Sequence, residues 1–278
     1  MMKFLLQKMK VETPSAVKYT LLDEAHPLVM NDLIGKEITL KHTNNKYCSV
    51  CDNNVKKFFG QGFCYPCFIK APENSECIIR PELCKGHEGE GRDPDWEERN
   101  HVQAHVVYLA LTSAVKVGVT RKVSTVSRWI DQGAWKAVVL AEVPNRYLAG
   151  KLEIALKAHM TDKTNWRKML KNEMNFSFDL AAFKKEVLSL VPEDLQQYLK
   201  EEEEVLEINY PVQEYPLKVV SSNFDKTPEI SGTLKGIRGQ YLFFEEGKVL
   251  NIRKFTGYEV ELSVSESKEI QSEQMSLF

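Results

Sequence analysis

The sequence predicts an α+β fold in a chain of several modules, and three observations support this prediction. All six cysteines fall between Cys48 and Cys84, which indicates a separate metal-binding module. Short runs of alternating apolar and polar residues lie near both ends and predict β-strands, whereas the middle of the chain adds runs with the helical period. The 278 residues, 43% of them hydrophobic and 27% charged, are enough for two or three small cores.

We expect six segments in chain order. They are an N-terminal β region over residues 1–45, a zinc ribbon with an acidic Cys/His connector over 46–100, an α/β domain over 101–175, a helical segment over 176–207, a small β domain over 208–264 and a flexible tail over 265–278. In the first segment, the alternating runs "KFLLQKMKV", "VKYTLL" and "KEITLKH" predict short antiparallel strands.

Two cysteine pairs carry the most specific signal in the sequence. Cys48 and Cys51 form one C-x2-C pair, Cys64 and Cys67 form another, and twelve residues separate the pairs. Such pairs sit on tight turns that direct two thiolates at one point, so the spacing predicts a zinc ribbon. Four thiolates leave no open coordination position, which favours a structural zinc over a catalytic one. A redox site or an iron–sulfur cluster is the alternative.

A second metal site is expected in the connector. Cys77, Cys84 and His87 offer three ligands, and His101 or His105 could supply the fourth. The connector has little apolar material to hold it together, which favours a second zinc. The alternative is two ordinary buried cysteines and a surface histidine.

Charge is segregated along the chain although the net charge is only −2. Residues 71–100 contain nine acidic and four basic residues, whereas residues 101–175 contain twelve basic and five acidic ones. This basic segment predicts a surface that faces a polyanion.

The basic segment has a mixed pattern of strands and helices. Strands are predicted at Val106–Leu111, at Ala114–Val119 and over "WKAVVLAEV", with a helix around Thr125–Gln132 between the second and the third. A further helix begins after Asn145 and carries an apolar stripe.

The last third of the chain returns to β pattern. Helices are first expected after Asp179, with a break at Pro192. From Leu217 to Val264, short runs separated by glycine turns predict four or five strands that either close a small barrel or pack on the N-terminal strands.

The basic segment resembles the GIY-YIG endonuclease superfamily from about His105 to Lys171. The resemblance rests on "VVY", "KVGVTR", "SRW" and "KLEIAL". It implies that Tyr108, Arg128 and Glu153 are catalytic and that Glu153 binds magnesium or manganese. Val117 and Gly118 match the end of the second family motif.

One position departs from the family pattern in a way that matters. Lys116 stands where the second motif opens with a tyrosine. A lysine there could hold a phosphate, work as a base, or mark a domain that binds nucleic acid without cutting it. Glu153 lies on the apolar side of its predicted helix, so a ligand is expected, the alternative being a salt bridge to Lys157 or Lys151.

Several other side chains are candidates for phosphate contact, with a solvated charged face as the alternative. They are Thr120, Arg121, Lys122, Arg146, Lys151, Lys163 and Arg167. For Trp129, Trp135 and Trp166 the expected role is core packing, with stacking on an exposed base as the alternative.

Over nearly all of the chain before the tail, the sequence resembles bacterial domain-of-unknown-function family 2797. The resemblance rests on "CYPC", "RPELC", "VKVGVTR", "RWIDQGA", "DKTNWRKML" and "GIRGQYL" with "LNIRK". It implies a zinc ribbon and a diverged nuclease-like domain.

The final residues are similar to the short peptide by which bacterial replication and repair proteins bind the DNA sliding clamp. In "QMSLF", Gln274 would hydrogen-bond, while Met275, Leu277 and Phe278 would fill an apolar groove. The alternative is an apolar end that packs on its own domain.

Together these patterns predict a zinc-containing DNA-processing protein, with a structure-selective endonuclease in repair or replication as the leading hypothesis. The rivals are a catalytically inactive nucleic-acid-binding adaptor and an RNA- or ribosome-binding protein. No apolar run approaches the roughly 18 residues of a membrane span, so a cytoplasmic location without membrane contact is expected. The sequence does not fix the oligomeric state.

Overall fold

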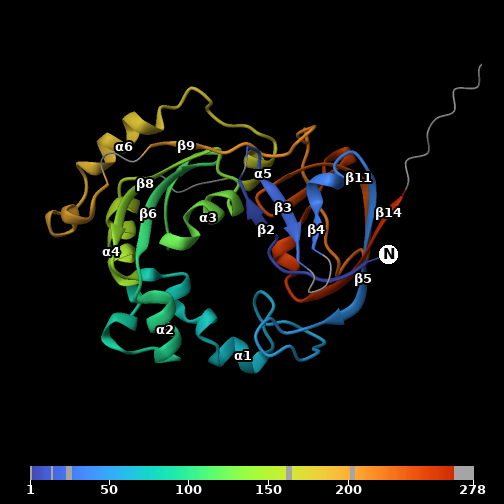
Figure 1. The fold of residues 1–278 in the computed structure, drawn as a ribbon, viewed down its shortest axis with the longest axis horizontal. Coiled ribbons are helices and arrows are strands. Elements are labelled where there is room, and N and C mark those ends of the chain that lie inside the picture. Colours follow the sequence, from blue (N-terminus) through green and yellow to red (C-terminus); the bar gives the residue numbers. More distant parts are fainter. Residues whose placement is uncertain (1, 14, 23–26, 161–164, 201–203, 266–278) are drawn as a thin grey trace, which may run out of the picture.

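The computed structural model describes residues 2–13, 15–22, 27–160, 165–200 and 204–265. It has the mixed α+β class that the sequence predicts, with two larger sheets and one small one. Figure 1 shows a sheet with flanking helices beside a second, strand-rich half, with the cysteine-bearing segment running along one side of both.

The strand-rich half is built from both ends of the chain. Its seven-stranded sheet has the order β1-β14-β5-β11-β12-β13-β10. The strands are β1 (Met2–Leu5), β5 (Glu37–Lys46), β10 (Val220–Ser221), β11 (Glu229–Arg238), β12 (Tyr241–Phe244), β13 (Lys248–Asn251) and β14 (Tyr258–Ser265). All neighbours are antiparallel except the pair β10 and β13. A small sheet of β2 (Lys10–Glu12), β3 (Lys18–Leu21) and β4 (Leu28–Val29) accompanies it, followed by a 3-10 turn at Met30–Leu33.

The prediction of a closed C-terminal barrel is wrong. In the described part of the chain, the strands after residue 217 form no closed barrel, because β5 from the N-terminal region pairs with β14 on one side and with β11 on the other. The apolar faces of these strands are instead covered by N-terminal residues such as Leu6, Met9 and Tyr19. The alternative prediction, that these strands pack on the N-terminal strands, is the one that the structure confirms.

The basic segment forms a four-stranded antiparallel sheet in the order β7-β6-β8-β9. Its strands are β6 (His105–Leu111), β7 (Val115–Arg121), β8 (Lys136–Val143) and β9 (Leu206–Glu207). All seven residues of β6 are buried, as expected for a strand between two neighbours.

Helices pack around this second sheet. They are α3 (Thr125–Asp131), α4 (Arg146–Lys157) and α6 (Leu180–Leu188), with a 3-10 turn at Lys122–Ser124 before α3 and another at Glu193–Tyr198 after α6. The short helix α5 (Trp166–Leu170) packs instead on the seven-stranded sheet, where Met169 and Leu170 contact Phe243 and Val249. The predicted N-caps are present: the side chains of Asn145 and Asp179 accept hydrogen bonds from the backbone N–H groups of Leu148 and Ala182. Leucines of α4 and α6 pack with β6 and β8 in one buried cluster.

The connector consists of short turns and one helix. After α1 (Tyr65–Lys70) come 3-10 turns at Pro72–Asn74, Glu76–Ile78, Pro81–Leu83 and Gly86–Glu88, and then α2 (Pro94–His101). Arg92 ties the connector to α1, since its guanidinium donates to the carbonyls of Phe68 and Ala71.

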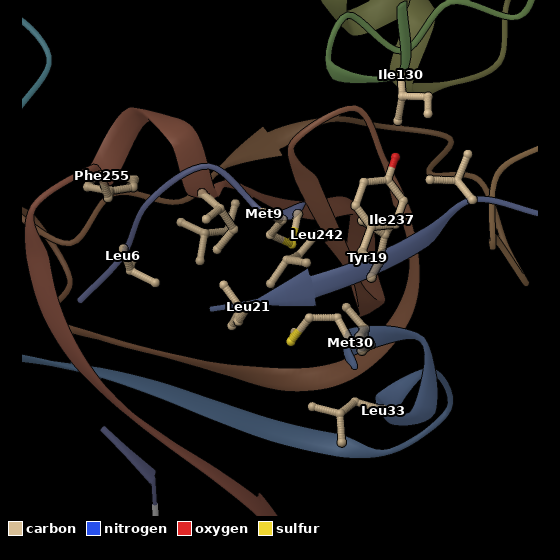
Figure 2. Close-up of a cluster of buried hydrophobic side chains, with 14 of the residues drawn as sticks. Leu6, Met9, Tyr19, Leu21, Met30, Leu33, Ile130, Ile237, Leu242 and Phe255 are labelled. Carbon is tan, nitrogen blue, oxygen red and sulfur yellow. The ribbon is translucent and has the colours of Figure 1, made fainter. Parts of the chain in front are cut away.

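One hydrophobic cluster joins the two halves. Tyr108, Trp129 and Ile130 belong to the same buried cluster as residues of the seven-stranded and small sheets. Figure 2 shows Ile130 of α3 reaching toward Tyr19, Ile237 and their neighbours. The two sheets are therefore held together by shared apolar packing.

Polar contacts fix the same junction. Arg238 is almost fully buried and donates to the carbonyl of Gly133, which follows α3 with a φ of 69°. Gln240 donates to Asp131 at the end of α3, and Lys8 forms an ion pair of 2.6 Å with the same carboxylate. The end of α3 is thereby anchored to the seven-stranded sheet.

Candidate functional site

The cysteines Cys48, Cys51, Cys64 and Cys67 come together in one cluster. Their sulfur atoms all lie within 4.8 Å of one another, and the Sγ atoms of Cys51 and Cys64 are 3.7 Å apart. In a tetrahedral site with Zn–S bonds of about 2.3 Å, neighbouring sulfurs lie roughly 3.8 Å apart. The cluster is thus compatible with a structural zinc ion.

Two tight turns bring these sulfurs to one point. In the first, the N–H of Asp52 donates to the carbonyl of Cys48, and Asp52 adopts a φ of 55°. In the second, Cys64 precedes α1 and its own N–H points at the Cys48 sulfur over 3.3 Å. Burial raises the pKa of the Cys48 thiol, but the N–H groups of Cys64, Cys51 and Val50 outweigh it and lower this pKa to about 6. The two turns therefore favour the metal-binding thiolate form of Cys48.

A second cluster lies in the connector. It contains Cys77, Cys84, Glu97 and His101, all buried, with ligand atoms within 4.8 Å of one another. The Nδ1 atom of His101 is 3.8 Å from the sulfur of Cys77, 3.6 Å from that of Cys84, and in contact with the Glu97 carboxylate. Glu97 and His101 are four residues apart on α2 and so share one helix face.

His87, expected as the third ligand of this cluster, is not part of it. Its ring stacks on Tyr147 with the ring centroids 4.6 Å apart. His101, one of the two expected fourth ligands, is in the cluster, whereas the Nδ1 of His105 contacts the carbonyl of Gln103. Glu97 is a ligand candidate that the sequence analysis did not predict, although its spacing of four residues from His101 places both on one helix face.

An open cleft of about 1570 Å³ lies where the two halves and the cysteine-bearing segment meet. Among its described lining residues, nine basic side chains face four acidic ones. The basic residues are Lys8, Arg80, Arg92, Lys116, Arg121, Arg128, Arg146, Lys157 and Arg253, and the acidic ones are Glu73, Glu76, Asp131 and Glu153. The cleft is therefore suited to an anionic ligand.

Tyr108, Lys116, Arg128 and Glu153, the four residues expected to be catalytic, all line this cleft. The register of β6 and β7 sets Tyr108 opposite Gly118. Lys116, Gly118 and Thr120 alternate along β7 and so share one face of the sheet. The sequence separation between these residues and Glu153 is bridged by the packing of α4 on the sheet.

Tyr108 is held in one orientation. Its side chain is 1% exposed, and its hydroxyl accepts a hydrogen bond from the Nε2 of Gln132. The ring lies directly over Gly118, where a Cβ atom would be 2.6 Å from the hydroxyl. Burial raises the pKa of Tyr108, against smaller lowering effects of Arg128 and Gln132. Tyr108 is consequently a neutral phenol near neutral pH.

Three arginines from different elements crowd the cleft. Arg128 comes from α3, Arg146 from the start of α4 and Arg253 from the 3-10 turn Ile252–Phe255. Displacement of solvent by the surrounding protein lowers the pKa of Arg146 and of Arg253, and the Arg128 charge lowers each of them further. Like charges placed so close together are stabilised when an anion binds between them.

Glu153 is buried on α4, with a side chain of which 10% is exposed. Its carboxylate pairs with Lys157 one turn later at 3.2 Å, which is one of the two salt bridges expected as the alternative. Burial raises the pKa of Glu153, while Lys157 and Arg146 lower it. Glu153 thus combines a place in the cleft with an ion pair.

The residues expected to contact phosphate divide into two groups. Thr120, Arg121 and Arg146 line the cleft. Lys122 pairs with Glu142, Lys151 lies 3.7 Å from Asp194, and the Arg167 guanidinium lies over the Trp166 ring, all away from the cleft lining. Lys163 lies outside the described residues.

The tryptophans engage in packing contacts. Trp129 is buried and meets Tyr108 edge to face. Trp135 packs edge to face on Phe176, and Trp166 stacks on Tyr241.

Some cleft residues were missed in the sequence. Arg253 and Lys8 come from the strand-rich half, in which no site residue was predicted, and Arg92 comes from the acidic connector. Arg253 stands in "LNIRK", which carries the family resemblance but gives this arginine no role, and only the fold brings these residues to the cleft.

The expected clamp-binding residues Gln274, Met275, Leu277 and Phe278 lie outside the described residues, so this partner stays a prediction. Within the described part of the chain, no helix is both long and apolar enough to cross a membrane.

The chain matches a protein-family model. Residues 35–260 match the family described as "Protein of unknown function (DUF2797)", a range that contains both cysteine clusters and the catalytic candidates. No curated protein and no solved structure matches the chain. Since the family match covers well over half of its length, the chain belongs to the DUF2797 family.

Proposed function

We propose that this protein is a zinc-containing, metal-dependent endonuclease of GIY-YIG type that acts on DNA in the basic cleft. One observation carries the proposal: Tyr108, Lys116, Arg128 and Glu153, each chosen from a sequence motif, line the same cleft. Residues scattered over a stretch of this length would not be expected to converge there if their resemblance to the motif were accidental.

The electrostatics of the cleft support a phosphodiester as the ligand. Its positive surplus complements the charge of a polyanion, and the three arginines come from three elements. Guanidinium groups bind phosphate through paired N–H donors and stabilise the charge that develops when a water attacks the phosphorus. The neutral phenol of Tyr108 would orient that water, while Lys116 would hold a phosphate oxygen.

The carboxylate of Glu153 suits a divalent metal ion. Magnesium and manganese are bound in such sites by one or two carboxylates together with substrate phosphates and water. Glu153 would supply the carboxylate. When bound, the ion would polarise the scissile phosphate. Glu153 would hold it, and Arg146 and Lys157 would balance the carboxylate in its absence.

A binding adaptor for DNA or RNA is the second candidate. The ion pair between Glu153 and Lys157 favours it, because it gives the carboxylate a partner that requires no metal. Lys116 in place of a tyrosine favours it as well.

The test is cleavage of labelled branched, flapped and single-stranded DNA, with RNA of the same sequence, in magnesium or manganese. We expect cleavage of at least one DNA substrate and a loss on the order of 100-fold or more in Glu153→Gln. Glu193→Gln, an exposed change outside the cleft, is the matched control.

Two results would contradict the proposal. Binding without cleavage of any substrate would leave the adaptor, and cleavage by Glu153→Gln at the wild-type rate would remove Glu153 as the metal ligand. Preferential binding and cleavage of RNA would replace DNA as the substrate.

A further inference from the structure

We propose that Cys77, Cys84, Glu97 and His101 bind a second zinc ion, and that this site holds Arg146 in the cleft. The site differs in one ligand from the one expected from sequence, because Glu97 takes the place of His87. Its consequence for nucleic-acid binding rests on the proposed function, whereas the metal site itself does not.

The donor set fits zinc. Thiolate, imidazole and carboxylate are the three ligand types that zinc takes, and four protein ligands make a closed, structural site. For Zn–S bonds of about 2.3 Å and Zn–N bonds of about 2.0 Å, a tetrahedral site separates sulfur and nitrogen by roughly 3.6 Å. The distances from His101 Nδ1 to the two sulfurs are 3.8 and 3.6 Å.

Burial of these groups also favours a bound cation. Glu97 is 2% exposed and His101 is 3% exposed. A buried carboxylate beside two thiols is costly unless a cation compensates it. Among the described residues of the connector, few large apolar side chains are buried, so packing alone does not explain how its turns are held.

The backbone is shaped around the ligands. A Cβ atom at Gly91 would lie 2.4 Å from the Cγ of Glu97, and one at Gly86 would lie 3.3 Å from the Cβ of the same residue. The ring of Trp96 covers His101 edge to face. These contacts leave room for the ligands and shield them from water.

The segment between the two cysteines is joined to the cleft through Arg146. The Nε of Arg146 donates to the carbonyl of Cys77 over 2.9 Å, and its Nη2 donates to that of Ile78 over 2.8 Å. These bonds use two of the five guanidinium donors, and the group lines the cleft. A metal ion that fixes Cys77 therefore fixes the orientation of Arg146.

The same segment also touches the helix that carries Glu153. At Gly150 the backbone of α4 approaches the connector so closely that a Cβ atom would lie 2.2 Å from the backbone nitrogen of Glu82. Glu82 lies between the two cysteine ligands in sequence. The metal site thus braces α4 at both Arg146 and Gly150.

Metal analysis of the full chain tests the site. We expect two zinc ions per chain in the wild type, one in His101→Ala and two in His87→Ala, the matched histidine control. His101→Cys should restore the second ion, because a thiolate can replace the imidazole. With cobalt in place of zinc, the thiolate charge-transfer absorption should fall by about a third in a Cys77→Ser, Cys84→Ser double variant, since two of six thiolates are lost.

One zinc ion in the wild type, or two in folded His101→Ala, would overturn the metal site. Loss of the second ion in His87→Ala would restore His87 as the ligand and overturn the set proposed here.

Equilibrium DNA binding without added magnesium tests the link to Arg146. His101→Ala and Arg146→Gln should each weaken binding by roughly three- to tenfold. Each should also reduce the slope of log affinity against log salt by about the contribution of one phosphate contact. The double variant should bind no more weakly than Arg146→Gln alone, and His87→Ala should bind as the wild type does. Wild-type affinity in His101→Ala with one zinc would overturn the link. If the wild type binds no DNA, the proposed function fails while the zinc content still decides the metal site.

Discussion

Glu153 is the residue at which the functional and the structural interpretations separate. As a structural residue it would contribute stability through its ion pair with Lys157, yet isolated helix pairs of this spacing contribute only about 0.3–0.5 kcal/mol. Burial opposes this stabilisation, because burial is the largest influence on the pKa of Glu153 and raises that pKa. A carboxylate that costs stability is more readily explained by a ligand than by the fold.

We therefore expect Glu153→Gln to raise the free energy of unfolding by about 1 kcal/mol at neutral pH. The buried pKa is raised above its unfolded value, so the folded state favours the protonated acid and ionisation lowers stability. The gain should be complete above the raised pKa, shrink as the pH falls through it, and vanish below the unfolded pKa of roughly 4.3. Urea unfolding at several pH values measures it.

Lys157→Gln is the control for this effect. It removes the partner and leaves the buried carboxylate, so it should lower stability by about 1 kcal/mol. A clear loss of stability in Glu153→Gln at neutral pH would instead show that Glu153 stabilises the fold through its ion pair with Lys157.

At the scale of elements, the pair of strands β6 and β7 decides whether the phenol reaches the cleft. Tyr108 lies opposite Gly118 in the register, and its ring occupies the space that a side chain at Gly118 would need. The glycine is required here by the close approach of Tyr108, since its φ lies outside the left-handed region.

Gly118→Ala should displace the Tyr108 ring and break its contact with Gln132. We expect a loss of roughly 1–3 kcal/mol of stability from overpacking and a loss of any cleavage activity. Thermal unfolding and the DNA assay measure the two effects. In the background of Tyr108→Ala, the same substitution should cost little stability, and an equal cost in both backgrounds would show that the ring is not the cause.

Elements with local signals were predictable from sequence, and the contacts between them were not. Asn145 and Asp179 cap their helices where the sequence places them, because a cap depends only on residues within one turn. The four cysteines of the first cluster are also near in sequence. Glu97 and His101 were harder to assign, since helix α2 and the Cys77 segment meet only through the fold.

At the scale of the whole molecule, the strand-rich half supplies part of the cleft. The alternation of residues 208–264 predicted strands but could not show that β5 would insert between β14 and β11. Pairing between chain ends is decided by long-range packing, which a local pattern does not contain. The arrangement also brings Arg253 of this half into the lining of the cleft that contains Arg128.

Substitution of Arg253 tests whether the ligand spans both halves. Arg253→Gln should weaken DNA binding and lower the slope of log affinity against log salt by about one contact. Lys254→Gln is the matched control, since it removes the same charge one residue later and outside the cleft lining, where its Nζ lies over the Phe255 ring. If the polyanion contacts only the four-stranded half, both variants will bind DNA equally well. If it follows the whole cleft, Arg253→Gln alone will lose affinity, because Arg253 lines the cleft from the turn after β13 and Lys254 does not line it.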